Sequence, residues 1–200
     1  MVRFVMDKGK IILLNGVSSS GKSTLGLALQ DTLPEKYFLF SQDGFSESWP
    51  YKYWKENHDG IYIETMNYMN RTIRMLAESG VNIIIDHLFL DNGKPNATGV
   101  VVLRDCVQSL YDLPVLFVRV DCDLDELDRR ERWRGDRGVG TAEWQMKELY
   151  PKHTYDMVVS TSALSTIRCA EEITKAVENL RSKSFADMKV RIDKGLSLEE

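Results

Sequence analysis

Four residues, Gly16, Gly21, Lys22 and Ser23, follow the spacing G-x-x-x-x-G-K-S, which is typical of a loop that binds nucleotide phosphates. Glycines let such a backbone curl so that its N–H groups point at anionic oxygens. The lysine can reach the β- and γ-phosphates, and the hydroxyl can bind Mg²⁺. An apolar run precedes the motif and a helix-period stretch follows it, so that the positive end of a helix faces the same phosphates. We therefore expect a nucleotide site that contains Gly16, Ser18, Ser19, Ser20, Gly21, Lys22, Ser23 and Thr24; the alternative is a serine-rich turn with an unrelated lysine.

Two acidic residues directly follow apolar runs that have the character of buried strands. Asp43 comes shortly after residues 37–40, and Asp86 comes directly after residues 81–85. Ligands of open α/β sheets bind beyond the carboxyl ends of the strands, so both acids should face the phosphate loop. We expect Asp86, with Ser23, to hold Mg²⁺ or its water shell, and Asp43 to act as the general base for an acceptor hydroxyl. Each acid has a structural alternative as a helix-capping or turn residue.

The segment after Asp43 is unusually rich in aromatic side chains and contains Pro50, which argues against one regular helix. Such side chains can form the wall of an acceptor pocket, and they can equally form a small core that packs the segment onto the sheet. The candidate acceptor-binding residues are Asp43, Phe45, Trp49, Tyr53, Trp54 and His87. For His87 a purely structural role is an equal alternative.

Arginines are concentrated in a segment with a Gly-Asp break, which we interpret as a lid at about residues 129–141. Arginines stabilise the negative charge that spreads over a phosphoryl group during transfer. Arg134 and Arg137 flank the break and are the candidate catalytic arginines, and Arg130 lies one turn earlier on the same helix face, toward the nucleotide. Arg129 and Arg132 have acidic partners at helical spacing and are expected to be surface charges.

Alternation of apolar runs and helix-period stretches predicts a three-layer α/β domain with a five-stranded parallel sheet, the fold of P-loop kinases. The strands are expected at residues 11–14, 37–40, 81–85, 115–120 and 157–159, and the helices at 24–32, 61–79, 98–111, 123–134 and 170–180. This predicts one domain over residues 1–181. The charged tail, residues 182–200, is expected to be frayed or to form a helix outside the core.

The composition excludes several classes of protein. A net charge of −4 over 200 residues argues against a broad nucleic-acid surface. No stretch approaches the roughly 20 apolar residues that span a bilayer, and the first ten residues do not have the pattern of a signal peptide. The three cysteines are odd in number and lack C-x-x-C spacing, which argues against a disulfide framework or a zinc site. We expect a cytoplasmic protein without a membrane partner, and nothing in the sequence indicates its oligomeric state.

Taken in order, these motifs resemble the chloramphenicol phosphotransferase-like proteins, a family of small P-loop kinases. The resemblance runs from about residue 11 to 162 and is carried by residues 12–23, the Asp43 region, 80–86, Arg134-Gly135-Asp136-Arg137 and 155–159. It implies ATP and Mg²⁺ as co-substrates, a small-molecule hydroxyl as acceptor and Asp43 as the base. It also implies phosphate contacts from Lys22, a metal-binding hydroxyl at Ser23 and lid arginines at Arg134 and Arg137.

The sequence departs from the family pattern at three places, and the last of them concerns the acceptor. His87 replaces a second acid, Ser160 replaces an acidic residue, and residues 45–60 match poorly. The chemistry implied is therefore an ATP-dependent O-phosphotransferase similar to chloramphenicol 3-O-phosphotransferase, with the acceptor open. The alternatives are a nucleotide, nucleoside or sugar-nucleotide kinase with zeta-toxin-like chemistry, and a non-catalytic ATP-binding regulatory module. A basic pocket beside Asp43 favours a nucleotide acceptor, whereas an apolar aromatic pocket favours a drug-like one.

Overall fold

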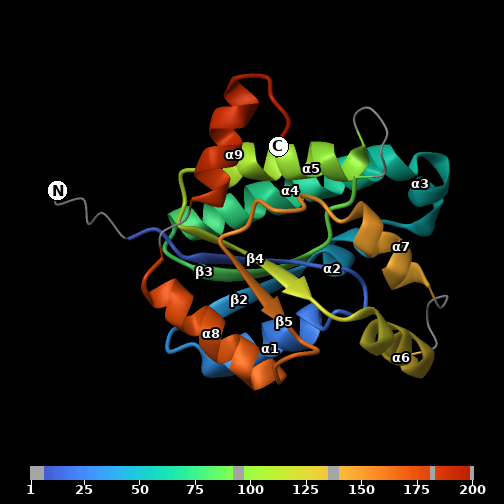
Figure 1. Cartoon of the computed structure of the whole chain (residues 1–200). Coiled ribbons are helices and arrows are strands. Elements are labelled where there is room, and N and C mark those ends of the chain that lie inside the picture. The colour runs from blue at the N-terminus through green and yellow to red at the C-terminus, as the bar shows by residue number, and fades with distance from the viewer. Residues whose placement is uncertain (1–6, 92–96, 135–139, 181–182, 199–200) are drawn as a thin grey trace.

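The computed structural model describes residues 7–91, 97–134, 140–180 and 183–198 around a central parallel sheet (Figure 1). The five strands are β1 (Ile11–Asn15), β2 (Tyr37–Ser41), β3 (Asn82–His87), β4 (Val115–Asp121) and β5 (Met157–Ser160). Their order is β2-β3-β1-β4-β5, and each neighbouring pair is parallel. The predicted α/β class and all five predicted strands are confirmed, and β1, which precedes the phosphate loop, lies at the centre.

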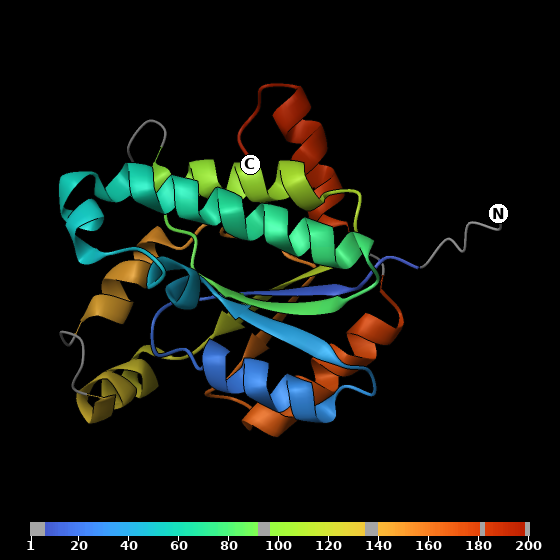
Figure 2. The same ribbon diagram turned by 180° about the vertical axis from the view of Figure 1, so that it is seen from behind.

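Helices cover both faces of the sheet and also gather at one edge. Figures 1 and 2 show that helices pack on each of the two faces. The first face carries α4 (His58–Glu78), α5 (Thr98–Leu110) and α9 (Ser184–Asp193), and the second carries α1 (Lys22–Thr32) and α8 (Thr166–Glu178). At the edge toward which the strands point lie α2 (Gln42–Ser46), α3 (Tyr51–Glu56), α6 (Leu124–Arg134) and α7 (Thr141–Glu148). Among the described helices, none has both the length and the apolar character needed to cross a membrane.

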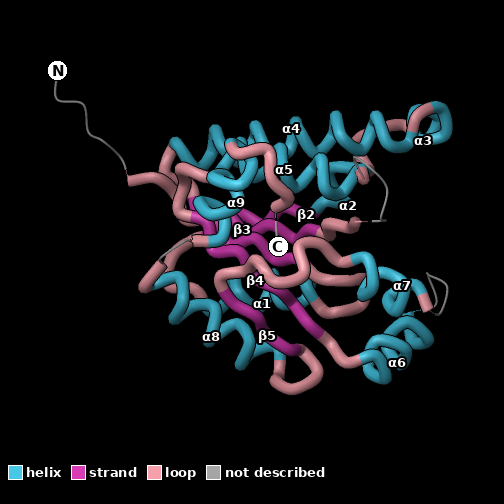
Figure 3. The backbone as a smooth tube through the Cα atoms, turned by 45° about the horizontal axis from the view of Figure 1, so that its top comes forward, coloured by secondary structure: helices cyan, strands magenta, loops and turns pink. Residues whose placement is uncertain are grey.

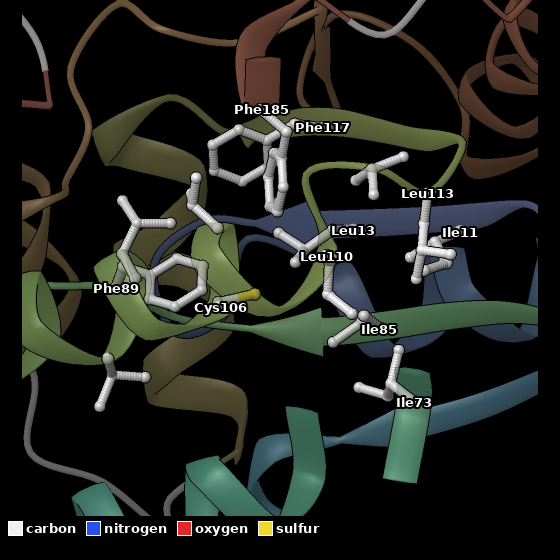
Figure 4. Packing of buried hydrophobic residues seen from close by; sticks show 14 of the residues in the cluster. Ile11, Leu13, Ile73, Ile85, Phe89, Cys106, Leu110, Leu113, Phe117 and Phe185 are labelled. Carbon is white, nitrogen blue, oxygen red and sulfur yellow. The ribbon is translucent and has the colours of Figure 1, made fainter. Parts of the chain in front are cut away.

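The core consists of two apolar layers, one on each face of the sheet. Along β1, Ile11 and Leu13 pack into the layer under α4, α5 and α9, while Ile12 and Leu14 pack into the layer over α1 and α8. All four side chains are fully buried, which explains why the strand is a continuous apolar run rather than an alternating one. Figure 4 shows the first layer, where Phe185 lies beside Phe117 and above the central strands.

The C-terminal segment differs from the sequence-based expectation, because its helix packs into the core instead of lying outside it. Phe185, Met188 and Leu198 are fully buried in the layer that contains Phe117. The carboxylate of Asp156 holds this segment in place, since its Oδ1 accepts the N–H groups of residues 183 and 184 at 2.9 and 3.0 Å and its Oδ2 accepts the Phe117 N–H at 2.8 Å. The expectation was wrong because widely spaced apolar residues in a highly charged segment give a weak pattern.

The other differences concern short helices at the carboxyl edge. The aromatic segment forms two helices, α2 and α3, that are separated at Pro50, which agrees with the expectation that it is not one regular helix. Helix α7 was not expected, because it has eight residues and only Ala142 and Gln145 are buried. A short helix with so small a buried face has no detectable apolar periodicity.

Replacing Asp156 with alanine should destabilise the protein by about 1–3 kcal/mol, because three N–H groups, two of them in partly buried bonds, lose their acceptor. Urea unfolding followed by circular dichroism measures the change. The matched control is Asp187→Ala, which removes an exposed carboxylate from the first turn of the same helix. Equal midpoint shifts for the two variants would contradict this account of how α9 is held.

Candidate active site

The loop of residues 16–21 joins β1 to α1 and has a conformation that few residue types tolerate. Gly21 has φ of 93° and Ser19 has φ of 61°, both in the left-handed region. A Cβ added at Gly16 would lie 2.4 Å from the carbonyl oxygen of Val120, so only glycine fits against β4 at this point. These values match the curled backbone that the motif predicts, with its open side at the carboxyl end of the central strand.

Arg130 of α6 holds the outer part of this loop. Its Nη1 donates to the carbonyl oxygen of Ser19 at 3.1 Å, its Nη2 donates to the carbonyl oxygen of Thr161 at 3.1 Å, and its Nε bonds Glu126 at 2.7 Å. Thr161, directly after β5, donates its hydroxyl to the carbonyl oxygen of Ser20 at 2.6 Å. Arg130 therefore lies at the predicted nucleotide site, where it fixes the backbone of the phosphate loop.

Gln145 of α7 holds the inner part of the loop. Its Oε1 accepts the N–H of Ser18 at 2.6 Å, and the side chain is buried, with 7% of the residue exposed. Sequence reasoning did not identify this residue or Thr161. Neither belongs to a motif, and each reaches the loop from an element more than 120 residues away in the chain.

The structure brings Lys22, Ser23 and Asp86 together. The Ser23 hydroxyl donates to Asp86 Oδ2 at 2.6 Å, and Lys22 Nζ lies 3.8 Å from Asp86 Oδ1 while it donates to the carbonyl oxygen of Val17 at 3.0 Å. Asp86 is 8% exposed and pairs in register with Leu14, two residues before the loop. The expected meeting of the β3 acid with the phosphate loop is therefore present. Thr24, the last residue expected at this site, is exposed in the first turn of α1.

Asp43 lies in the first turn of α2, where it lines a cavity of about 830 Å³. The capping role that was its alternative belongs to Ser41, whose Oγ accepts the Gly44 N–H at 3.0 Å. Beside Asp43 in the wall stands Tyr62 of α4, and burial, with the nearby Asp43 carboxylate, raises the pKa of its phenol. Gln42 accepts the Leu88 N–H at 3.1 Å and so joins α2 to the segment after β3.

The cavity wall is aromatic and acidic. Its aromatic side chains are Trp49, Tyr51, Trp54, Tyr62 and Trp144, and its carboxylates are Asp43, Glu47 and Asp59. Among the described residues that line it there is no lysine or arginine. One histidine, His58, also lines the cavity, and its Nδ1 is 3.2 Å from Asp59. Lys55 lies beside the wall, with its Nζ 5.1 Å from the ring centre of Tyr51.

Three of the expected acceptor-binding residues, Phe45, Tyr53 and His87, do not line this cavity. Phe45 packs on Phe40 and the main core, and Tyr53 contacts Trp49 edge to face with 5.9 Å between ring centres. These contacts correspond to the small-core alternative. Trp49 and Trp54 do line the cavity, as does Tyr51 of the same aromatic segment, and Trp144 is a further wall residue that the prediction missed.

His87 has a structural position next to Asp86. It is 4% exposed and stacks on Phe89 with 3.9 Å between ring centres. Burial, and to a lesser extent the nearby Lys22 ammonium, lowers the pKa of its imidazole to about 3, so the ring is neutral. Its Nδ1 has no hydrogen-bond partner among the described residues.

Among the remaining arginines, the two that were expected to be surface charges are confirmed, whereas the two expected in the lid are not tested. Arg129 pairs with Glu126 and Arg132 pairs with Asp128, and both are exposed surface charges. Arg134 is exposed at the end of α6. Arg137 lies outside the described residues, so the lid roles of both arginines stay predictions.

In the described ranges, no three His, Cys, Asp or Glu side chains gather in a way that could hold a metal ion by themselves. The candidate metal ligands beside the phosphate loop are one carboxylate, Asp86, and one hydroxyl, Ser23. This pair suits Mg²⁺, which keeps several waters and takes its other ligands from nucleotide phosphates.

Solved structures with the same fold include several kinases. The APS kinase of Mycobacterium tuberculosis, solved with AMPPNP and APS, has a TM-score of 0.60 at 15% identity, covering 86% of this chain and 98% of that one. A gluconokinase of Sinorhizobium meliloti has a TM-score of 0.60 at 16% identity, with 87% and 94% covered. The tunicamycin resistance protein of Deinococcus radiodurans has a TM-score of 0.60 at 21% identity, with 85% and 96% covered.

Sequence comparison gives a more specific result. A Mycobacterium tuberculosis (strain H37Rv) protein named "Putative O-phosphotransferase" is 27% identical over 197 residues, which is 86% of this chain and 84% of that protein. The model of the family described as "Chloramphenicol phosphotransferase-like protein" matches residues 9–178, a range that contains the phosphate loop, Asp43, Asp86 and α7. The chain thus belongs to the chloramphenicol phosphotransferase-like family, the family that its sequence motifs resemble.

Proposed function

We propose that this protein transfers the γ-phosphate of ATP to a hydroxyl group of a small molecule bound in the 830 Å³ cavity. The observation that carries the proposal is the position of Asp43. This carboxylate stands in the cavity wall directly after β2, while the Lys22–Ser23–Asp86 cluster lies at the end of the neighbouring β3. A carboxylate at this edge of the sheet, in a cavity that can hold an acceptor, supports the role of Asp43 in phosphoryl transfer.

In this mechanism the loop N–H groups and Lys22 hold the phosphates and balance their charge. Ser23 and Asp86 would hold Mg²⁺, which would neutralise charge on the phosphates when bound. Asp43 accepts the proton of the acceptor hydroxyl. The hydroxyl oxygen attacks the γ-phosphorus as ADP leaves. Arg134 and Arg137 approach from the lid and stabilise the transferred group.

The cavity wall favours an acceptor without negative charge. Three carboxylates with no described lysine or arginine in the wall repel a phosphate or carboxylate, whereas aromatic rings accept an apolar body. This distinguishes the proposal from its main alternative, a nucleotide or sugar-nucleotide kinase, which needs basic groups beside Asp43. The family name, and the fold shared with a tunicamycin resistance protein, support an antibiotic-like acceptor.

A panel of matched acceptors tests the proposed class. Chloramphenicol and uridine are uncharged hydroxyl compounds, whereas UMP and gluconate carry negative charge. With ATP and Mg²⁺, acceptor-dependent ADP release should be at least about tenfold faster with the best uncharged compound than with either anion. A preference for UMP or gluconate would contradict an uncharged acceptor, and a preference for uridine over chloramphenicol would favour the alternative nucleoside kinase. Tight ATP binding without transfer to any compound would favour the regulatory module.

Asp43→Asn should lower kcat for the accepted compound by about 10²- to 10⁴-fold, because the amide cannot take up the hydroxyl proton. The KM for ATP should change little, since Asp43 is outside the phosphate loop. Asp59→Asn is the control, because it makes the same change at a second carboxylate of the same wall. Full activity of Asp43→Asn would remove the general-base role.

Ser23→Ala should raise the Mg²⁺ concentration needed for half-maximal activity by about tenfold or more, because the metal loses a hydroxyl ligand. Titration of ADP release with MgCl₂ at fixed ATP measures the effect. Ser23→Thr keeps the hydroxyl and should stay near wild type. If the alanine and threonine variants respond alike, the hydroxyl is not a metal ligand.

A further inference from the structure

Helix α7 contacts both halves of the candidate site through two adjacent residues. Gln145 accepts the Ser18 N–H in the phosphate loop at 2.6 Å, and Trp144 lines the acceptor cavity. The two side chains differ in exposure, because Gln145 is 7% exposed whereas Trp144 is 51% exposed. One helix therefore presents a polar contact to the nucleotide side and an aromatic surface to the acceptor side.

On the nucleotide side, packing reinforces the hydrogen bond. Val17, which precedes Ser18 in the loop, lies in a small buried cluster with Ala142 of α7 and Leu149 at its end. Since this cluster is close-packed and separate from the two main layers, a displacement of the loop at these residues displaces α7 as well.

The start of α7 is tied to the helix that holds the other part of the loop. Glu131 of α6, which is 1% exposed, accepts the N–H groups of Gly140 and Ala142 at 2.9 and 2.7 Å. Arg130, the residue before it, bonds the carbonyl oxygen of Ser19. Figure 3 shows α6 and α7 side by side at the edge of the molecule. Successive loop residues are thus held by two helices that are joined to each other.

The end of α7 is tied to the acceptor side. The Asp91 N–H donates to the carbonyl oxygen of Glu148 at 2.7 Å, and the Tyr150 N–H donates to the carbonyl oxygen of Phe89 at 3.0 Å. These bonds pair the segment after α7 with the segment after β3, in which Leu88 and Leu90 line the cavity. Two parts of the cavity wall, Trp144 and this segment, are therefore attached to α7.

We propose that α7 couples the two substrate sites, with Gln145 as the positioning residue that transmits nucleotide binding at the loop to the acceptor wall at Trp144. The inference rests on the proposed function, because it takes the loop as the ATP site and the cavity as the acceptor site. Phosphate oxygens reorient the N–H groups of the loop, and the Ser18–Gln145 bond carries that change into α7. Coupling between binding sites is reciprocal. An acceptor bound at Trp144 therefore strengthens ATP binding by the same factor by which ATP strengthens the binding of the acceptor.

The fluorescence of Trp144 tests this coupling without knowledge of the acceptor. The chain has four tryptophans, so the emission of Trp144 is taken as the difference between the spectra of wild type and Trp144→Phe. The ligand added is the non-hydrolysable ATP analogue AMPPNP, together with Mg²⁺. The analogue should change this emission in the wild-type background. In a Gln145→Met background, which keeps the volume of the side chain but removes its acceptor oxygen, the change should fall below about half of the wild-type value.

Calorimetry on the same proteins separates coupling from binding. AMPPNP should bind Gln145→Met with a Kd within about tenfold of wild type, because Arg130 and Thr161 still hold the loop in this variant. A disrupted loop would not allow that affinity. Glu143→Gln alters an exposed residue of the same helix and should retain both affinity and signal. If Gln145→Met does not fold, Gln145→Asn replaces it, because its shorter side chain cannot reach Ser18 from the same backbone.

Each outcome has a distinct meaning. Binding with an unchanged Trp144 signal in wild type, or an undiminished signal in the Gln145 variant, overturns the coupling and leaves the proposed function intact. Failure of AMPPNP to bind wild type overturns the proposed function, and the coupling with it. A diminished signal with retained affinity supports Gln145 as the positioning residue.

Discussion

The constraint on which the site depends is the tight curl of the backbone between β1 and α1. Ser19 has a left-handed conformation that costs a non-glycine residue about 1–2 kcal/mol. Gly16 lies against the carbonyl oxygen of Val120 with no room for a side chain. Such a conformation persists only where its surroundings hold it, and here Arg130, Gln145 and Thr161 do so through the loop's own backbone groups.

These three residues explain why the second half of the chain is needed for a loop that the first half encodes. They come from α6, α7 and the end of β5, whereas the loop belongs to the first strand-to-helix connection. The order of the strands brings these residues to the loop. Strand β1 lies between β3 and β4, and β5 lies on the far side of β4. The same order places Asp86 at the level of Leu14 and Ser41, between the loop and Asp43.

Charge is divided between the two sides of the site. Lys22, the loop N–H groups and the start of α1 form the cationic side, where the carboxylate of Asp86 lies 3.8 Å from the lysine. The cavity is acidic and aromatic among its described lining residues. Helix α7 is bonded to the phosphate loop through Gln145 and to the segment after β3 through the carbonyl oxygen of Glu148, and the proposed coupling of the two sides rests on these bonds.

The sequence alone determined the α/β class, the five strands and the chemistry of the loop. These follow from local patterns, namely apolar runs of strand length and a motif whose spacing suits one ligand. It also placed Asp43 and Asp86 at the correct edge, since strand ends are local features as well. Only the tertiary structure decided that Gln145 and Thr161 hold the loop and that α9 belongs to the core. It also decided that Trp144 lines the cavity whereas Phe45, Tyr53 and His87 do not. These contacts join residues distant in the chain, and no local period or spacing encodes which side chains meet across a folded sheet edge.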